Sequence, residues 1–388
     1  MGENNDSVTE VTTQSWGSKL KSSIGSMLFG IVLFIGAFPL LWWNEGRAVG
    51  TLRSLQEMQK VVVSVEDAKA LPANEGKLIH IVGSAKTADV LRDDEFGVSA
   101  NAIALTRSVS MYQWIEQSQS DSKKKVGGST ETTTTYTYSK GWSDTLHNSS
   151  KFKKQEGHQN PGEMRYRGDN FQAENVAVGD FKLSQSLISR IGGSESFSIS
   201  KAALAGIPKA KVTGSIIYIG ADPDNPAVGD YKVSYSVKSP GKDVSIIAKQ
   251  MGKSLTQYMS KRGKQMELLS MGTLSADDMI TKSKQQNTLI TWLIRVGGLV
   301  LMGLGFSMIF SPLVALAEVL PFLSSLLGAG IGLVSFLVAL ALSFVTIAIA
   351  WIFYRPVLGI LLLVAAAGAI VLVFVLGKNK KKAPAAAA

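Results

Sequence analysis

The sequence predicts an α+β membrane protein with four transmembrane helices, one N-terminal and three C-terminal, and a β-rich extracytoplasmic domain between the first and the second. Residues 289–376 contain only three charged side chains, Arg295, Glu318 and Arg355, and a bilayer-crossing helix needs about 20 apolar residues. Residues 24–43 form a further apolar segment of that length. Between them, residues 44–288 are more polar and contain stretches in which apolar residues alternate with a period of two. Three buried helices of a soluble enzyme are not favoured, because so long an uncharged run would not stay soluble.

The C-terminal apolar region divides into three spans, residues 289–310, 324–351 and 357–376. Pro312 and Pro321 mark an interfacial segment, residues 311–323, and Arg355-Pro356 separates the last two spans, since proline interrupts helices. Residues 24–43 could also be a signal peptide. The exit Trp42-Trp43-Asn44-Glu45 lacks the small residues of a cleavage site, which favours an uncleaved span.

Positive charge predicts the orientation. Lys19 and Lys21 precede the first span, and a lysine cluster follows the last, so the tails at residues 1–23 and 377–388 are expected in the cytoplasm. The domain at residues 44–288 then faces the periplasm of a bacterial inner membrane, or the lumen of a eukaryotic endoplasmic reticulum or inner nuclear membrane. Arg295 is expected to snorkel to the interface, with a gating or headgroup role as the alternative. The interface anchors expected on the far side are Trp42, Trp43, Trp292, Arg295, Trp351, Tyr354 and Arg355.

The domain begins with a helix and continues with strands. Residues 1–18 are polar and expected to be disordered. Residues 45–60 have a helical pattern, and a period of two predicts strands at residues 61–65, 78–82, 104–116 and 132–139. Residues 118–129, rich in Ser, Lys and Gly, are expected to form a loop or hairpin tip.

Further along, the sequence predicts two hairpins, a short internal sequence repeat and the start of a helix. Residues 231–237 and 244–248 flank a Ser-Pro-Gly turn, and a second hairpin turns at Arg262-Gly263. Residues 175–184 resemble residues 225–234, which indicates either a duplicated subdomain or shared turn chemistry. Ser275 starts a capping-box-like pattern, from which one helix is expected to run into the second span.

No set of residues indicates catalysis, a cofactor or a metal. The chain has 388 residues, no cysteine and three histidines, and it lacks the nucleophile-elbow, phosphate-loop and zinc-helix motifs. His158 and Asn160 precede Pro161 in a predicted turn, where hydrogen bonding within the turn is favoured over a catalytic pair. Glu45 and Arg47 are interpreted as an interfacial charge pair, with partner docking as the alternative. The chain is therefore not expected to be an enzyme.

Several motifs in one order resemble a known family. They are Asn44-Glu45-Gly46-Arg47-Ala-Val, Met111-Tyr-Gln-Trp-Ile-Glu, Gly157-His158-Gln-Asn160-Pro161, Val228-Gly-Asp-Tyr-Lys-Val-Ser and Trp351-Ile-Phe-Tyr-Arg-Pro. The chain resembles the transmembrane protein 43 (LUMA) family over nearly its whole length after about residue 20. The resemblance implies cytoplasmic termini, a large lumenal domain and, for animal members, a nuclear-envelope role with emerin and lamins. The absence of cysteine and the alanine-rich tail favour a bacterial member, which would lack emerin and lamin partners.

The spans favour assembly over transport. Gly328 and Gly332, with the small residues 365–369, allow close helix packing, whereas ion routes need ionisable groups at mid-membrane. We therefore expect a non-enzymatic multi-pass scaffold that organises a membrane or membrane complex. An ion channel or transporter subunit is the alternative. The expected partners are the lipid bilayer, further copies of the chain and other membrane proteins, and nothing indicates nucleic acid.

Overall fold

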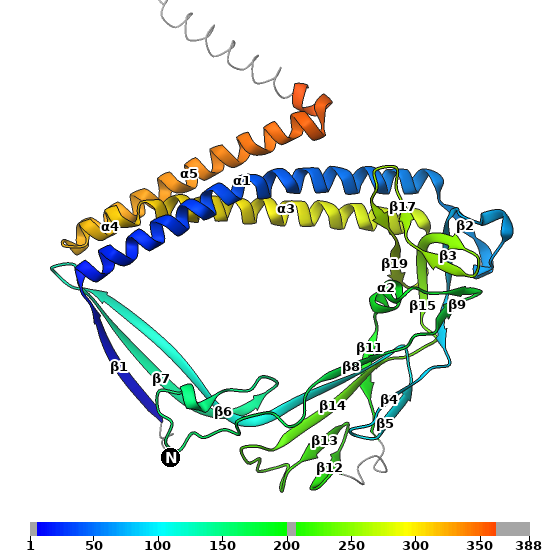
Figure 1. Ribbon diagram of the computed structural model, residues 1–388, viewed down its shortest axis with the longest axis horizontal. Helices are drawn as coiled ribbons and strands as arrows, with labels where there is room; N and C mark the ends of the chain where they lie inside the picture. The colour runs from blue at the N-terminus through cyan, green and yellow to red at the C-terminus, as the bar shows by residue number, and fades with distance from the viewer. Residues whose placement is uncertain (1–5, 200–206, 362–388) are drawn as a thin grey trace, which may run out of the picture. The chain divides into compact units, whose positions relative to one another are not determined.

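The computed structural model describes residues 6–199 and 207–361, which form two compact units (Figure 1). The β-rich unit comprises the described residues up to 12, together with 54–123 and 131–283. The helical unit comprises residues 13–53, 124–130 and the described residues from 284 onwards. Helices α1 and α3 contribute residues to both units.

The β-rich unit contains two large sheets. In the eight-stranded sheet the order is β1-β7-β6-β14-β13-β12, with β11 paired to β14 and β8 paired to β6. Its strands are β1 (Ser7–Gln14), β6 (Ala104–Lys124), β7 (Thr130–Ser143), β8 (Asp169–Gln172), β11 (Ser194–Phe197), β12 (Ala210–Thr213), β13 (Ile216–Ile219) and β14 (Tyr231–Lys238). The alternating burial of β14 shows why this sheet forms, since Tyr231, Val233, Tyr235 and Val237 all face its core.

The seven-stranded sheet has the order β19-β15-β16-β10-β9-β3-β2, and β15 also pairs with β3. Its strands are β2 (Val63–Val65), β3 (Leu78–Thr87), β9 (Val176–Val178), β10 (Phe181–Lys182), β15 (Asp243–Met251), β16 (Ser254–Thr256) and β19 (Leu268–Met271). Helix α2 (Gln185–Arg190) contributes Leu187 and Ile188 to its core. Two small hairpins join β4 (Val90–Asp93) to β5 (Val98–Asn101) and β17 (Tyr258–Met259) to β18 (Gln265–Met266).

The helical unit contains most of α1 (Trp16–Val61) and α3 (Ala276–Ile309), together with α4 (Ser311–Ala317) and α5 (Pro321–Tyr354). By length and composition three helices are able to cross a membrane, namely Trp16–Val61, Ala276–Ile309 and Phe322–Tyr354. The expected fourth span, residues 357–376, is described only as far as residue 361. Its remainder, including residues 365–369, and the tail at residues 377–388 lie outside the described residues.

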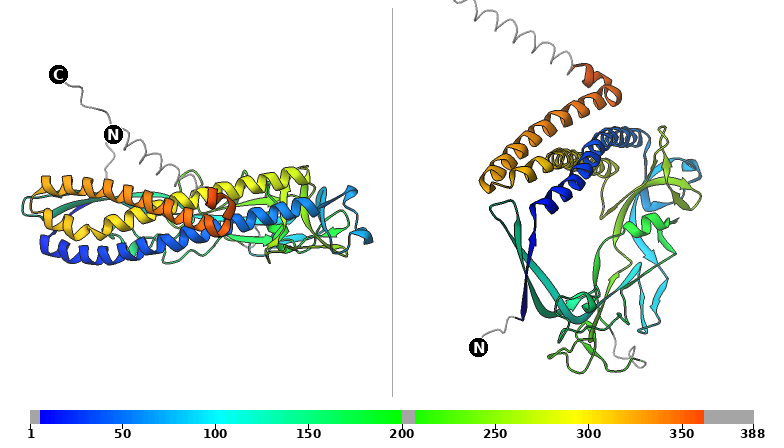
Figure 2. Two further views of the ribbon diagram at one scale, coloured as in Figure 1. Left: turned by 90° about the horizontal axis from the view of Figure 1, so that it is seen from above. Right: turned by 60° about the vertical axis from the view of Figure 1, so that its left-hand side comes forward.

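Helices α1 and α3 run antiparallel in close contact (Figure 2). A Cβ atom built on Gly30 would lie 2.7 Å from the carbonyl oxygen of Gly305, and one built on Gly305 would lie 2.6 Å from the backbone nitrogen of Phe34. The two glycines therefore let the backbones meet. At Gly328 and Gly332 a built Cβ has no neighbour within 4 Å among the described residues, so the packing role expected of these glycines stays a prediction for contacts between chains.

The N-terminal tail differs from the prediction. Residues 7–14 form strand β1 instead of a disordered segment, and β1 pairs with β7 at the edge of the eight-stranded sheet (Figure 1). The segment contains two valines and three threonines, and these β-branched residues favour strands. The expected loop at residues 118–129 is also shorter, since β6 extends to Lys124.

The predicted hairpin at residues 231–248 is wrong, although both of its strands exist. β14 belongs to the eight-stranded sheet and β15 to the seven-stranded sheet. The Ser-Pro-Gly segment therefore connects the two sheets and does not turn a hairpin. The repeated Val-Gly-Asp motifs are likewise divided between the sheets, which favours shared turn chemistry. Gly179 and Gly229 both have a positive φ in these turns. The hairpin at Gly263 and the helix start at Ser275 are confirmed.

Candidate functional site

A buried carboxylate joins α1, α3 and α5, the long helices described in the helical unit. Glu45 of α1 is 0% exposed. Its Oε1 accepts a 2.7 Å hydrogen bond from Nε of Arg295 on α3, and its Oε2 accepts bonds of 2.9 Å from the Arg295 guanidinium and 2.8 Å from the indole of Trp351 on α5. The guanidinium also lies over the rings of Trp292 and Trp351. Each helix thus supplies one part of a charge-neutral lock, which we call the Glu45 lock.

A layer of amides and hydroxyls borders the Glu45 lock. The Arg47 guanidinium donates to the side chains of Asn44, Asn287 and Thr291 at 3.0–3.1 Å. Asn44 donates to the Thr291 carbonyl, and Asn287 donates to the Ala48 carbonyl, each at 3.0 Å. These polar groups bind one another across α1 and α3, as polar groups in an apolar surrounding must.

The Glu45–Arg47 pair expected from the sequence is wrong, because Glu45 pairs with Arg295 and Arg47 binds amides. The spacing of Asn287, Thr291 and Arg295 could have indicated this polar contact, because residues at i, i+4 and i+8 share one helix face. Gly46 packs against the ring of Tyr354, which also meets Trp42.

The expected interface anchors occupy different surroundings. Trp43 and Trp292 are largely exposed on the helix surface, as an aromatic belt requires. Trp351 binds Glu45, and the Arg355 guanidinium lies 5.7 Å from the Trp351 ring centre. The Arg295 side chain binds Glu45 and packs against two tryptophan rings, so it does not extend freely to the interface. Anchoring by the exposed tryptophans stays a prediction.

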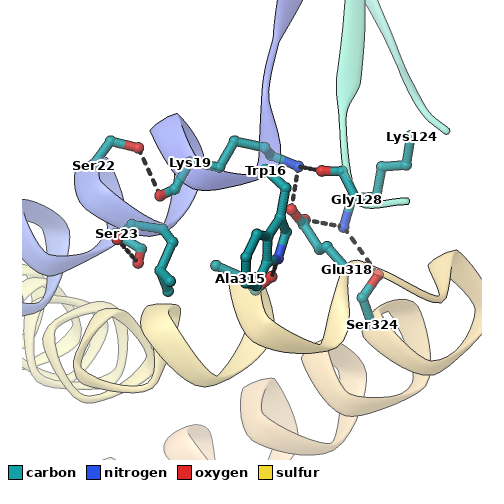
Figure 3. Close-up of polar contacts among 10 residues, drawn as sticks. Trp16, Lys19, Ser22, Ser23, Lys124, Gly128, Ala315, Glu318 and Ser324 are labelled. Carbon is teal, nitrogen blue, oxygen red and sulfur yellow. Dashed lines mark hydrogen bonds and ion pairs between the residues drawn. The ribbon is translucent and has the colours of Figure 1, made fainter. Parts of the chain in front are cut away.

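A second polar cluster lies at the start of α1 (Figure 3). Glu318, at the end of α4, is 7% exposed and forms ion pairs with Lys19 and Lys124, the latter at 2.7 Å. The indole of Trp16 donates to the Ala315 carbonyl at 2.8 Å, and the backbone N–H of Gly127 donates to the Val319 carbonyl. We call this arrangement the Glu318 cluster. Burial by itself raises the pKa of Glu318, but hydrogen bonds from Lys124 and Lys19 outweigh burial and lower it.

The Glu318 cluster combines residues that the sequence placed on opposite sides of a membrane. Lys19 and Glu318 are expected on one side if α1 and α3 both cross. Lys124, after the first span, is expected on the other side, yet it binds the same carboxylate. Lys19 and Lys124 therefore cannot both bind Glu318 within one chain if α1 crosses the membrane.

The third polar cluster is in the β-rich unit, around His158. This side chain is 1% exposed, and its ring centre lies 4.5 Å from that of Trp114 and 4.2 Å from that of Tyr138. Its Nε2 is 2.7 Å from a carboxylate oxygen of Asp6, the residue before β1. Asn160 donates to the carbonyls of Trp114 and His147 and accepts from the Trp114 N–H.

The geometry around Asn160 supports the structural interpretation of the His158-Gln-Asn160-Pro161 turn, because its amide bridges a strand and a loop. Pro161 follows directly and packs near Gly229. No feature of the sequence indicated that Asp6 would join this cluster, because the residues around it were expected to be disordered.

Comparisons with known proteins point to one family. Residues 111–356 match the family model described as Transmembrane protein 43. A Mus musculus protein named transmembrane protein 43 is 33% identical over 359 residues, covering 90% of this chain and 89% of the relative. The Homo sapiens protein of that name is 32% identical, with 89% and 88% covered. A Drosophila melanogaster homolog is 29% identical, with 91% and 95% covered. No solved structure matches the chain.

Proposed function

Because the chain belongs to the transmembrane protein 43 family, we propose that it is a non-enzymatic membrane scaffold that acts through lateral assembly and partner binding. The three long apolar helices among the described residues support an integral membrane protein. The scaffold function would keep the β-rich unit at a membrane surface, where partners can reach it.

The Glu45 lock is the observation that carries this proposal. A conducting path needs polar groups that can replace the hydration shell of an ion. In the lock, three donors satisfy the carboxylate and two rings cover the guanidinium. These groups favour a fixed contact between helices over a route for ions.

We further propose that residues 6–23 and the α3–α5 connection face the cytoplasm and that most of the β-rich unit lies on the other side. Lys19 and Lys21 support this orientation, and so does the ion pair of Lys19 with Glu318. The membrane would be the inner membrane of a bacterium, or the endoplasmic reticulum and inner nuclear membrane of a eukaryote.

Ion flux into liposomes tests the scaffold against a channel. The full chain in liposomes should give no flux above empty liposomes, and mass analysis in native lipid should show oligomers. An Arg295→Lys variant keeps the charge but loses the forked contact to Glu45, and Arg262→Lys, in the β-rich unit, is the matched control. A conductance in the wild type that changes only with Arg295→Lys would replace the scaffold with a channel.

A further inference from the structure

We propose that the outer edge of β7 is a docking site for an extended acidic segment of a partner protein, and that β1 fills this site in the structure. β1 is the last strand of the eight-stranded sheet on the β7 side. Such an edge presents unpaired backbone groups to any extended chain of suitable sequence. The inference rests on the proposed function, since it gives the chemistry of the scaffold's partner.

β1 is attached by its backbone and its charges, with little apolar burial. The Tyr138 N–H donates to the Asp6 carbonyl at 3.2 Å, and the Thr12 hydroxyl donates to the Thr132 carbonyl at 3.5 Å. Val11 is 58% exposed, and Ser7, Thr9 and Thr12 are exposed as well. An edge strand with so few apolar contacts belongs to the less stable part of a fold and is replaceable.

Two carboxylates supply the recognition. Asp6 lies 2.6 Å from Nζ of Lys154 and 2.7 Å from Nε2 of His158. Glu10 lies 2.7 Å from Nζ of Lys153 and 3.4 Å from the Tyr136 hydroxyl.

Residues four apart on a strand face the same side. The Asp6 and Glu10 carboxylates can therefore contact Lys153, Lys154 and His158 at the same time. The rings of Trp114 and Tyr138 hold the His158 ring in position. The site is therefore selective for acidic side chains at positions i and i+4.

Chain connectivity shows why β1 is not a permanent occupant. α1 begins at Trp16, directly after β1, and is long and apolar enough to cross a membrane. Residues before and after a crossing helix lie on opposite sides, and β7 follows α1 in the sequence. When α1 crosses, β1 therefore leaves β7, and the edge beside Lys153, Lys154 and His158 is open to an acidic segment from another protein.

A peptide-binding experiment tests the site in the full chain. The protein is held in lipid nanodiscs, and the probe is a fluorescent peptide with the sequence of residues 6–14. A second peptide, with Asn and Gln in place of the two acidic residues, reports the charge contribution. A Val8→Pro, Val11→Pro variant removes backbone donors of β1, so its own strand cannot compete. We expect it to bind the acidic peptide at least as tightly as the wild type does.

The Lys153→Gln, Lys154→Gln variant should weaken binding of the acidic peptide by roughly tenfold, and added salt should weaken it further. Lys151→Gln, a nearby exposed lysine, should have no effect, and melting temperatures confirm that each variant is folded. Equal binding of both peptides, or no binding to the proline variant, overturns the proposal. Loss of oligomers in the proline variant would identify β1 of a second copy as the occupant and also overturn it. Ion flux does not affect these readouts, so the test can fail while the scaffold proposal stands.

Discussion

Asp93 and Arg107 form an ion pair inside the core of the eight-stranded sheet. Asp93 is 2% exposed, and its two carboxylate oxygens accept bonds of 2.9 and 2.8 Å from Nη1 of Arg107. Tyr235 adds a 2.6 Å bond to the same carboxylate, and Arg107 also donates to the Arg167 carbonyl. Burial and the bond to Asp93 raise the pKa of Tyr235 above its ordinary value, so the phenol stays a donor.

Replacing Asp93 should therefore lower the free energy of unfolding far more than replacing Tyr235, which binds the same carboxylate. Asp93→Asn leaves the Arg107 charge buried without its full partner, and we expect a loss of about 3–5 kcal/mol in the free energy of unfolding. Tyr235→Phe removes one hydrogen bond and should cost about 1 kcal/mol. Chemical denaturation of the two variants measures the difference. Equal costs would mean that Arg107 finds another acceptor, such as Glu95, which already contacts it.

Asp6 gives the β1 contact a dependence on pH. Its hydrogen bond from Lys154, and then its contact with His158, lower the pKa of Asp6 below the ordinary value of 3.8. A group whose pKa is lowered in the docked state contributes fully above its ordinary value, and the contribution is lost as the pH falls through the lowered value. Acid should therefore release β1.

Hydrogen exchange of the Tyr138 amide, which binds the Asp6 carbonyl, measures this release in detergent solution. After correction for the intrinsic pH dependence, protection should fall below about pH 4. In an Asp6→Asn variant the protection should be lower from the start and independent of pH in that range. Full protection of the wild type in acid would show that the backbone bonds hold β1 without Asp6.

At the scale of elements, the contact between α1 and α3 depends on two glycines. Leucine at Gly305 would meet the α1 backbone at 2.6–3.0 Å, and such overpacking costs about 1–3 kcal/mol. We expect Gly305→Leu to lower the melting temperature in lipid. Gly328→Leu is the matched control, because nothing lies within 4 Å of that position. A destabilised Gly328 variant with unchanged Gly305 would place the helix contact on α5, within the oligomer.

The sequence predicted individual elements better than their partners. Alternating apolar residues located β3, β6 and β14, and the capping pattern at Ser275 located the start of α3. Periodicity describes which face of a strand is buried, but not which strand lies beside it. The assignment of β14 and β15 to one hairpin failed for that reason.

The candidate site was less predictable than the fold. The Glu45 lock joins residues 250 and 306 positions apart, and no local pattern pairs such distant groups. The residues of the lock were singled out one by one as interface anchors or a motif. Their contact with each other comes from the packing of α1, α3 and α5. β1 was missed because the polar composition of its segment outweighed its β-branched valines and threonines.

At the scale of the whole molecule, two separate sets of contacts bear on whether α1 can cross a membrane. In the β-rich unit, Asp6 and Glu10 bind residues that follow α1 in the sequence. In the helical unit, Lys124 binds Glu318 together with Lys19. Both sets require residues before and after α1 to share one side of any membrane. Because a single crossing forbids this, a membrane-crossing α1 and docking of β1 within one chain exclude each other.

Accessibility of introduced cysteines distinguishes these states, because the chain has no cysteine of its own. Thr9→Cys reports β1, and Asp94→Cys reports an exposed turn of the β-rich unit. In sealed vesicles, a membrane-impermeant maleimide should label the two positions from opposite faces if α1 crosses. A bifunctional cross-linker between Thr12→Cys and Thr132→Cys should then react in detergent micelles, which have no two sides, and fail in vesicles. Labelling from one face together with cross-linking in vesicles would show that α1 does not cross the membrane. The β7 edge would then be occupied by β1 in the membrane-bound protein, and the predicted orientation of the β-rich unit would be wrong.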